Sequence, residues 1–125
     1  MSWDVFIQHL PASAARVADI PDDFQPLPLG SEDDVLQAIR TVFPTFRLTE
    51  PTGGVVEAPG YSIEIGFTVE SVALFIRGDE RVVPRIAQLV ELLGARAVDS
   101  WTGEFFDPET APESIRRWQQ YVSEL

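Results

Sequence analysis

The sequence contains no cysteine, no lysine and only one histidine. Without cysteine, the chain can form no disulfide and no thiolate zinc site, and it has no cysteine nucleophile. The lone histidine, His9, has no second histidine and no adjacent nucleophile in the sequence, so we expect a structural or surface role for it. A protein without disulfides fits the reducing cytoplasm, which is where we expect this one.

Long hydrophobic runs and the common catalytic motifs are also missing. No apolar run approaches the roughly 18 residues that span a bilayer, and the first residues lack the basic stretch and apolar core of a signal peptide. There is no nucleophile elbow and no His-Glu-x-x-His zinc motif, and no lysine follows Gly53-Gly54 as it would in a phosphate loop. We therefore expect no membrane partner, no cofactor, no metal and no catalytic residue that a motif identifies.

Basic residues are scarce relative to acidic ones. The chain has 20 Asp and Glu against nine basic residues, all of them arginine, and a formal net charge of -11. Such a surface repels a phosphate backbone, because nucleic-acid affinity comes largely from basic side chains that displace counterions. Nucleic acid and anionic lipid are therefore disfavoured, whereas a basic protein would be attracted. The same charge also serves simple solubility.

With 125 residues and 45% hydrophobic content, the chain has the size and composition of one globular domain, residues 1–125. We expect its centre at residues 61–77. The first part of this stretch alternates apolar and polar side chains, as a half-buried strand does. Residues 72–77 are apolar on both faces up to Ile76, which predicts a central strand covered on both sides. Between the two runs, Glu70-Ser71 is the expected hairpin turn.

Three helices are expected around this hairpin. Ser31 and Asp34 form a variant of the capping box, and an apolar stripe with spacing of three and four residues follows them. A second helix has Pro84 in its first turn and Gly94 as its C-cap. A terminal helix is expected over residues 110–125, packed on the body of the domain.

Further strands are expected at residues 3–10, 46–48, 55–57 and 95–99, with Thr52-Gly53-Gly54 turning between the middle two. This order predicts an α+β two-layer sandwich, in which a mainly antiparallel sheet carries helices on one face. It is close to the ferredoxin-like β-α-β-β-α-β pattern, with an extra hairpin and a C-terminal helix. A different α+β topology fits the same elements.

One candidate site is an acidic arc, which comprises Asp19, Asp22, Asp23, Glu32, Asp33 and Asp34. No basic residue lies between Arg16 and Arg40, and four prolines stiffen the loop that leads into this stretch. The spacing of the acids does not give the alternating ligands and closing glutamate of an EF-hand, so calcium is not expected. The arc is interpreted either as a partner-facing patch or as a solvated edge.

A second candidate site is an aromatic loop, residues 100–106, which contains Trp101, Phe105 and Phe106. Large aromatic side chains dominate binding hot spots, so this loop is a candidate anchor for a partner. The same side chains would equally serve to close one end of the core. Asp99, Glu104 and Asp107 lie near Trp101, and paired carboxylates there would allow acid–base chemistry if their environments set their pKa values apart.

Three short motifs resemble a family of small bacterial proteins. They are Met1-Ser2-Trp3-Asp4-Val5, Leu93-Gly94-Ala95-Arg96-Ala97, and Asp99 with Thr102-Gly103-Glu104-Phe105. The resemblance extends over most of the chain, to about Asp107. No activity is established for that family, so the resemblance implies no chemistry. In its acidic, cysteine-free, single-domain character the chain is also similar to bacterial immunity proteins, by analogy alone.

These observations favour binding over catalysis. We expect a non-enzymatic module that recognises a basic protein, as an immunity-type inhibitor or an accessory subunit would. The expected contact residues are Asp22, Asp23, Glu32, Asp33, Asp34, Trp101, Phe105 and Phe106. Two alternatives stay open: a homo-oligomeric structural module that pairs through a sheet edge or the last helix, and a carboxylate-based enzyme around Asp99, Glu104 and Asp107.

Overall fold

Seven antiparallel strands form one sheet in the computed structural model, which describes residues 1–125. The order across the sheet is β2-β3-β4-β5-β1-β6-β7. The strands are β1 (Trp3–Gln8), β2 (Arg47–Glu50), β3 (Gly53–Ala58), β4 (Tyr61–Phe67), β5 (Val72–Gly78), β6 (Arg96–Asp99) and β7 (Glu104–Phe105). The helices are α1 (Glu32–Val42), α2 (Val83–Leu93) and α3 (Ala111–Ser123), with short 3-10 turns η1 (Val17–Asp19) and η2 (Glu80–Val82). The α+β class and the antiparallel sheet are as predicted.

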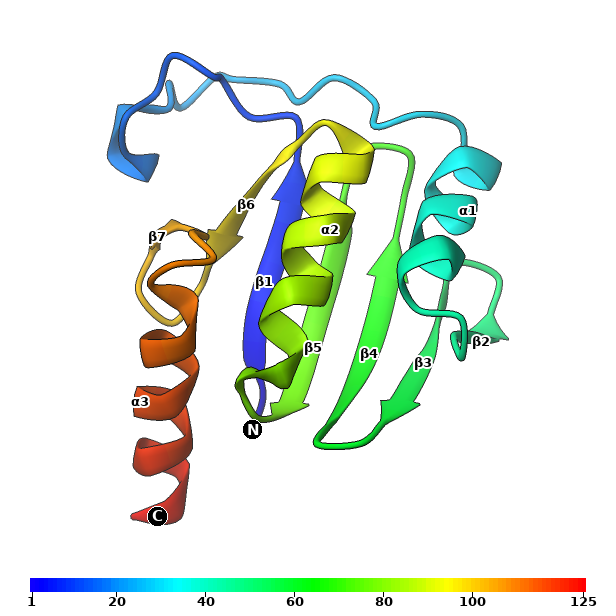
Figure 1. Ribbon diagram of the computed structural model, residues 1–125. Coiled ribbons are helices and arrows are strands. Elements are labelled where there is room, and N and C mark those ends of the chain that lie inside the picture. The colour runs from blue at the N-terminus through cyan, green and yellow to red at the C-terminus, as the bar shows by residue number, and fades with distance from the viewer.

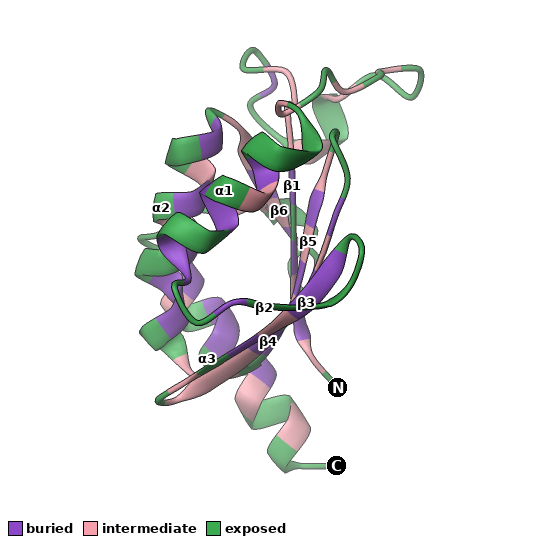
Figure 2. Ribbon diagram, turned by 90° about the vertical axis from the view of Figure 1, so that its right-hand side faces the viewer, coloured by how far each residue is buried: buried purple, intermediate pink, exposed green.

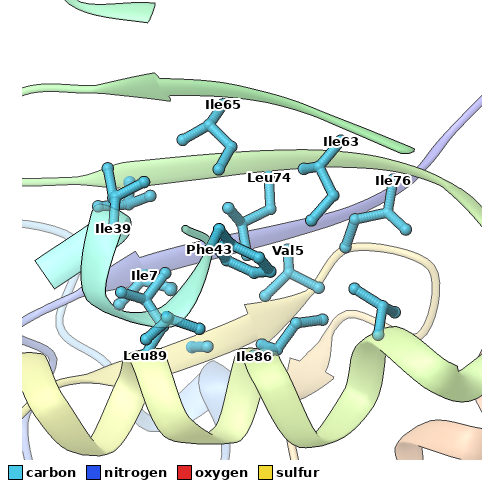
Figure 3. Packing of buried hydrophobic residues seen from close by; sticks show 14 of the residues in the cluster. Val5, Ile7, Ile39, Phe43, Ile63, Ile65, Leu74, Ile76, Ile86 and Leu89 are labelled. Carbon is cyan, nitrogen blue, oxygen red and sulfur yellow. The ribbon is translucent and has the colours of Figure 1, made fainter. Parts of the chain in front are cut away.

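The helices lie on one side of the sheet (Figures 1 and 2). Their apolar stripes meet the inward faces of the central strands, where Ile63, Leu74 and Ile76 point toward Ile86 and Leu89 of α2 (Figure 3). These side chains are almost completely buried. None of the three helices is both long and apolar enough to cross a bilayer.

The expected central hairpin is present as β4 and β5, and β5 lies in the middle of the seven strands. Its turn contains no Asn-Gly pair and is closed by a threonine instead. The Thr68 hydroxyl oxygen accepts hydrogen bonds from the backbone N–H groups of Glu70 and Ser71, each at 3.1 Å. A side chain that accepts backbone hydrogen bonds in this way stabilises a turn that its residue types would not otherwise favour.

The prediction that β5 is covered on both faces is wrong. Ala73 and Phe75 are only half-buried, because they alternate with the buried Val72, Leu74 and Ile76 and so lie on the opposite face of the sheet. Phe75 instead packs edge-on against Phe6 of β1, with ring centroids 6.1 Å apart. Mutual packing of two aromatic rings removes part of their apolar surface from water without a second layer.

The strands on either side of Pro51-Thr52 are longer than predicted, and both glycines lie inside β3 and not in the turn. Gly54 faces the core side, where β2 crosses close to β3. A Cβ atom on Gly54 would lie 2.2 Å from the Arg47 carbonyl oxygen and 2.8 Å from Cζ of Phe46. The glycine is therefore required by a close approach of backbones.

The predicted start of α1 and the predicted start and end of α2 are confirmed. Ser31 Oγ accepts from the Asp34 N–H, and the Asp34 carboxylate accepts from the Ser31 N–H, each at 3.1 Å. The helix α2 has Pro84 in its first turn and ends at Gly94, whose φ of 59° is left-handed. The ferredoxin-like pattern is not matched simply, because the sheet has seven strands where that pattern has four.

Candidate functional site

The open face of the sheet carries a hollow of about 640 Å³ over β3, β4 and β5. Gly53, Gly66 and Ala73 form its floor, and Phe75 stands beside them. The polar part of its lining consists of two carboxylates, Glu50 and Glu64, and the hydroxyls of Thr49, Thr52, Thr68 and Ser71. We call this surface the open-face hollow. Its volume falls within the range of about 300–1,000 Å³ typical of ligand sites.

Strand register creates this hollow. Gly53 pairs with Gly66, and Gly66 pairs with Ala73, so three small residues on adjacent strands form one row across the sheet. A Cβ atom added to Gly66 would meet nothing within 4 Å. The row is a depression because its own residues carry at most a methyl group, whereas the neighbouring row carries Val55, Glu64 and Phe75.

The open-face hollow is electrostatically negative. Glu50 is exposed and takes part in none of the ion pairs, and its Cδ lies 3.6 Å from the position of a Cβ atom on Gly53. Glu64 faces Arg77 at 3.5 Å, but both side chains are more than half exposed, so water screens this pair. No arginine lines the hollow. A cation is the ligand charge that this lining favours.

Sequence reasoning missed this site. Glu50, Glu64 and Phe75 were not among the expected contact residues, because the charge of an isolated glutamate on a strand carries no signal. The available signal was Gly66, a glycine inside an otherwise regular strand pattern. Such a glycine marks a bulge or a place where something approaches the backbone closely.

The acidic arc runs along one end of the sheet, from the last residue of η1 to the first turn of α1 (Figure 1). Asp19 and Asp34 have local roles, because each accepts a backbone N–H in a capping interaction. The other four acids, Asp22, Asp23, Glu32 and Asp33, are exposed and join no ion pair. The Leu29 N–H donates to the Val69 carbonyl at 2.6 Å, which brings the arc to the end of the sheet where the hollow begins.

The aromatic loop lies at the β7 edge of the sheet, beside α3 (Figure 1). Trp101 is 40% exposed and packs against Tyr121 of α3, with ring centroids 5.3 Å apart. Phe105 is half-buried under the guanidinium of Arg96, 3.5 Å from its ring centre, and Phe106 packs against the core. The start of the acidic arc lies close to this loop, because Arg16, whose backbone N–H donates to Asp19, pairs with Glu104 of the loop at 2.8 Å. The rest of the arc continues over the end of the sheet to α1 (Figure 1).

Asp99, Glu104 and Asp107 do line one pocket, of about 420 Å³. Asp99 is only 3% exposed, and its carboxylate accepts from the Ser114 hydroxyl at 2.5 Å and from the Trp101 N–H at 2.9 Å. Ser114 Oγ in turn accepts from Nε1 of Trp3 at 3.2 Å. This buried chain of hydrogen bonds ties β1, β6 and α3 together, so Asp99 has a structural role.

The other carboxylates of this pocket are engaged as well, including Glu113, which pairs with Arg117 at 2.9 Å. Glu104 pairs with Arg16 at 2.8 Å, and this hydrogen bond raises the pKa of Arg16. Asp107 accepts from the Glu109 N–H at 2.9 Å in the turn that precedes α3. No three His, Asp or Glu side chains lie close enough to hold a metal ion. The pocket therefore offers no carboxylate that lacks a structural partner.

One of the two arginines near the start of α2, Arg81, is also neutralised locally. Arg81 donates to both carboxylate oxygens of Asp79, at 2.7 and 3.0 Å. This hydrogen bonding holds the pKa of Asp79 below its ordinary value of 3.8 and raises the pKa of Arg81. Arg81 is thus not free to bind an anion together with Arg85.

We expect Asp79→Asn to lower the melting temperature near neutral pH but not in strong acid. A carboxyl whose pKa is depressed in the folded state stabilises that state above its unfolded pKa, and the contribution disappears as the pH falls through the folded value. Calorimetric melting curves of both proteins across the acid range test this. An equal difference in melting temperature at every pH would contradict a role for the Asp79 charge.

No family model, no curated protein and no solved structure matches the chain. The resemblance to a family of small bacterial proteins therefore rests on the three motifs alone.

Proposed function

We propose that this protein is a non-enzymatic, cytoplasmic binding module that recognises a basic protein, as an immunity-type inhibitor or an accessory subunit does. The observation that carries this proposal is how the charges are paired. Five of the nine arginines form ion pairs with nearby acids, namely Arg16, Arg77, Arg81, Arg116 and Arg117. Four acids of the acidic arc, and Glu50 in the open-face hollow, join none of these pairs.

The other four arginines, which join no ion pair, are Arg40, Arg47, Arg85 and Arg96. Arg96 donates through Nη1 to the carbonyl oxygens of Pro11 and Ala14, at 2.7 and 2.8 Å, and its guanidinium covers the Phe105 ring. Arg96 therefore holds the loop after β1 on the sheet. A large part of the negative charge is left uncompensated at the surface, and complementary charge steers a basic partner and aligns it on docking.

We also infer that β4, β5, β1 and β6, with α1 and α2, correspond to the ferredoxin-like pattern. Support comes from the order of these four strands and from the position of each helix in the chain, after β1 and after β5. The hairpin β2–β3 would then be an insertion after α1, and β7 with α3 a C-terminal addition. The open sheet face is free for binding in this arrangement because both helices lie on the other side.

The proposal is tested by capture from a lysate of the native host at low salt, followed by elution with a salt step. We expect the wild-type protein to retain a basic protein that salt releases, because exposed charges are screened within about 10 Å at 0.1 M salt. The captured protein is then purified and its affinity measured by calorimetry at two salt concentrations. A steep loss of affinity with salt is the expected result.

The matched control is a variant with Asp22→Asn, Asp23→Asn, Glu32→Gln and Asp33→Asn. It leaves Asp34 in place because that carboxylate caps α1, so the helix is preserved while the charge is removed. We expect this variant to retain less of the basic partner. Capture of no basic protein by the wild type, or an affinity for the purified partner that does not change with salt, would refute the proposal.

A further inference from the structure

We infer that the open-face hollow receives arginine or lysine side chains from an extended basic segment of the partner protein. This inference rests on the proposed function and adds to it the place of contact. The open-face hollow differs from the acidic arc in being concave and in combining charge with apolar surface. It lies on the sheet face that the helices leave uncovered (Figure 2).

The shape of the hollow suits a long side chain with an apolar stem. Gly66 leaves space for at least a methyl group, and Ala73 and Phe75 of β5 provide apolar surface beside it. Lysine and arginine bury their methylene stems along apolar surface while the charged group stays near water. The floor and the Phe75 wall can therefore take the stem, and the open side leaves the charged end accessible to acids.

The charges of the hollow suit the cationic end of such a side chain. Glu50 lies over Gly53 and has no arginine partner, and Glu64 stands one strand away with only a solvent-screened contact to Arg77. Thr49 and Thr52 add hydroxyl groups at the turn between β2 and β3. A guanidinium presents five N–H donors to such oxygens, and hydrogen bonds to carboxylates are roughly twice as strong as neutral ones.

A second copy of this chain is a poorer occupant of the same face. Each copy carries a net charge of -11, so two copies repel one another. The lining of the hollow contains no arginine, and two hollows placed face to face would therefore oppose carboxylates to carboxylates. Charge complementarity thus selects a basic partner over self-association.

The experiment is a titration of the isotope-labelled full-length protein, followed by NMR, with a short peptide of alternating arginine and threonine. The comparison peptide has glutamate in place of every arginine. We expect the arginine peptide to shift the amide signals of Gly53, Gly66 and Ala73 more than those of Asp22 and Asp33. The glutamate peptide should cause no comparable shifts.

Two variants locate the site. Gly66→Val fills the floor with a side chain that suits a strand, has room for its Cβ and does not attract cations. Glu50→Gln with Glu64→Gln removes the charge and keeps the shape. Each is expected to weaken binding of the arginine peptide by about tenfold or more, which corresponds to about 1.4 kcal/mol. Spectra and melting curves of the free variants establish that both are folded.

The fourfold variant of the acidic arc, with Asp22, Asp23, Glu32 and Asp33 neutralised, separates this inference from the proposed function. Full binding by Gly66→Val together with loss in the arc variant would overturn the inference and leave the arc as the site of the proposed function. A wild-type protein that does not prefer the arginine peptide would also overturn the inference. The proposed function would then be decided by capture of the native partner alone.

Discussion

Gly54→Ala is expected to destabilise the protein by about 3 kcal/mol or more, at the upper end of what overpacked substitutions cost. The new Cβ would lie 2.2 Å from the Arg47 carbonyl oxygen, which belongs to the backbone of β2 and cannot rotate away. It would also lie 2.8 Å from Cζ of Phe46, a side chain that is itself buried. Relief requires β2 to move off the edge of the sheet. Urea denaturation followed by circular dichroism measures the loss.

Gly66→Ala is the matched control, because Gly66 lies on the neighbouring strand and a Cβ there meets nothing within 4 Å. We expect it to leave stability unchanged or to raise it by up to about 1 kcal/mol, since glycine weakens a strand interior. Equal destabilisation by the two substitutions would contradict the contrast between the close approach of β2 at Gly54 and the open space at Gly66.

Asp99→Ala is expected to lower the free energy of unfolding by about 3 kcal/mol, because hydrogen bonds to a charged group contribute about 1.5–3 kcal/mol each. The substitution leaves the buried Ser114 hydroxyl without its acceptor and frees the Trp101 N–H that begins the aromatic loop. Trp3 then keeps only a serine that has lost its other partner. We expect α3 to detach first, and limited proteolysis near its start would detect that.

Two variants delimit this result. Ser114→Ala should also destabilise the protein, because it removes the hydrogen bonds to Asp99 and to Nε1 of Trp3. Asp22→Ala replaces an exposed acid that joins no ion pair, so its free energy of unfolding should stay within about 0.5 kcal/mol of wild type. If Asp99→Ala behaves like Asp22→Ala in urea denaturation, the buried network does not hold α3 in place.

The residues of the two candidate sites predicted from the sequence differ in how far they are exposed. The acids of the acidic arc are exposed as expected, although Asp34 is occupied as a helix cap. Phe106 packs on the core, in line with the interpretation that the aromatic loop closes one end of the core. Trp101 stays partly exposed and packs against Tyr121 of α3. The two sites come near each other at Asp19, through the ion pair of Arg16 with Glu104, and whether either binds a partner stays a prediction.

The open-face hollow was not predictable, because it depends on pairing between residues from three strands. Gly53, Gly66 and Ala73 meet only through the registers of β3, β4 and β5. A shift of one residue in any of these registers would turn its small residue to the other face of the sheet. Nothing in the local pattern around Glu50 indicates that its carboxylate lies over Gly53.

The sequence by itself determined the features that depend on neighbours along the chain. These are the net charge, the capping box at Ser31, the left-handed end of α2 at Gly94 and the alternation that builds β4. Each follows from side-chain chemistry within a few residues, where periodicity and capping act. The tertiary structure alone decided which face of β5 stays open, why Gly54 must be glycine, and that Asp99 is a buried anchor. These outcomes depend on strand order and register, which are set by contacts between residues far apart in the chain.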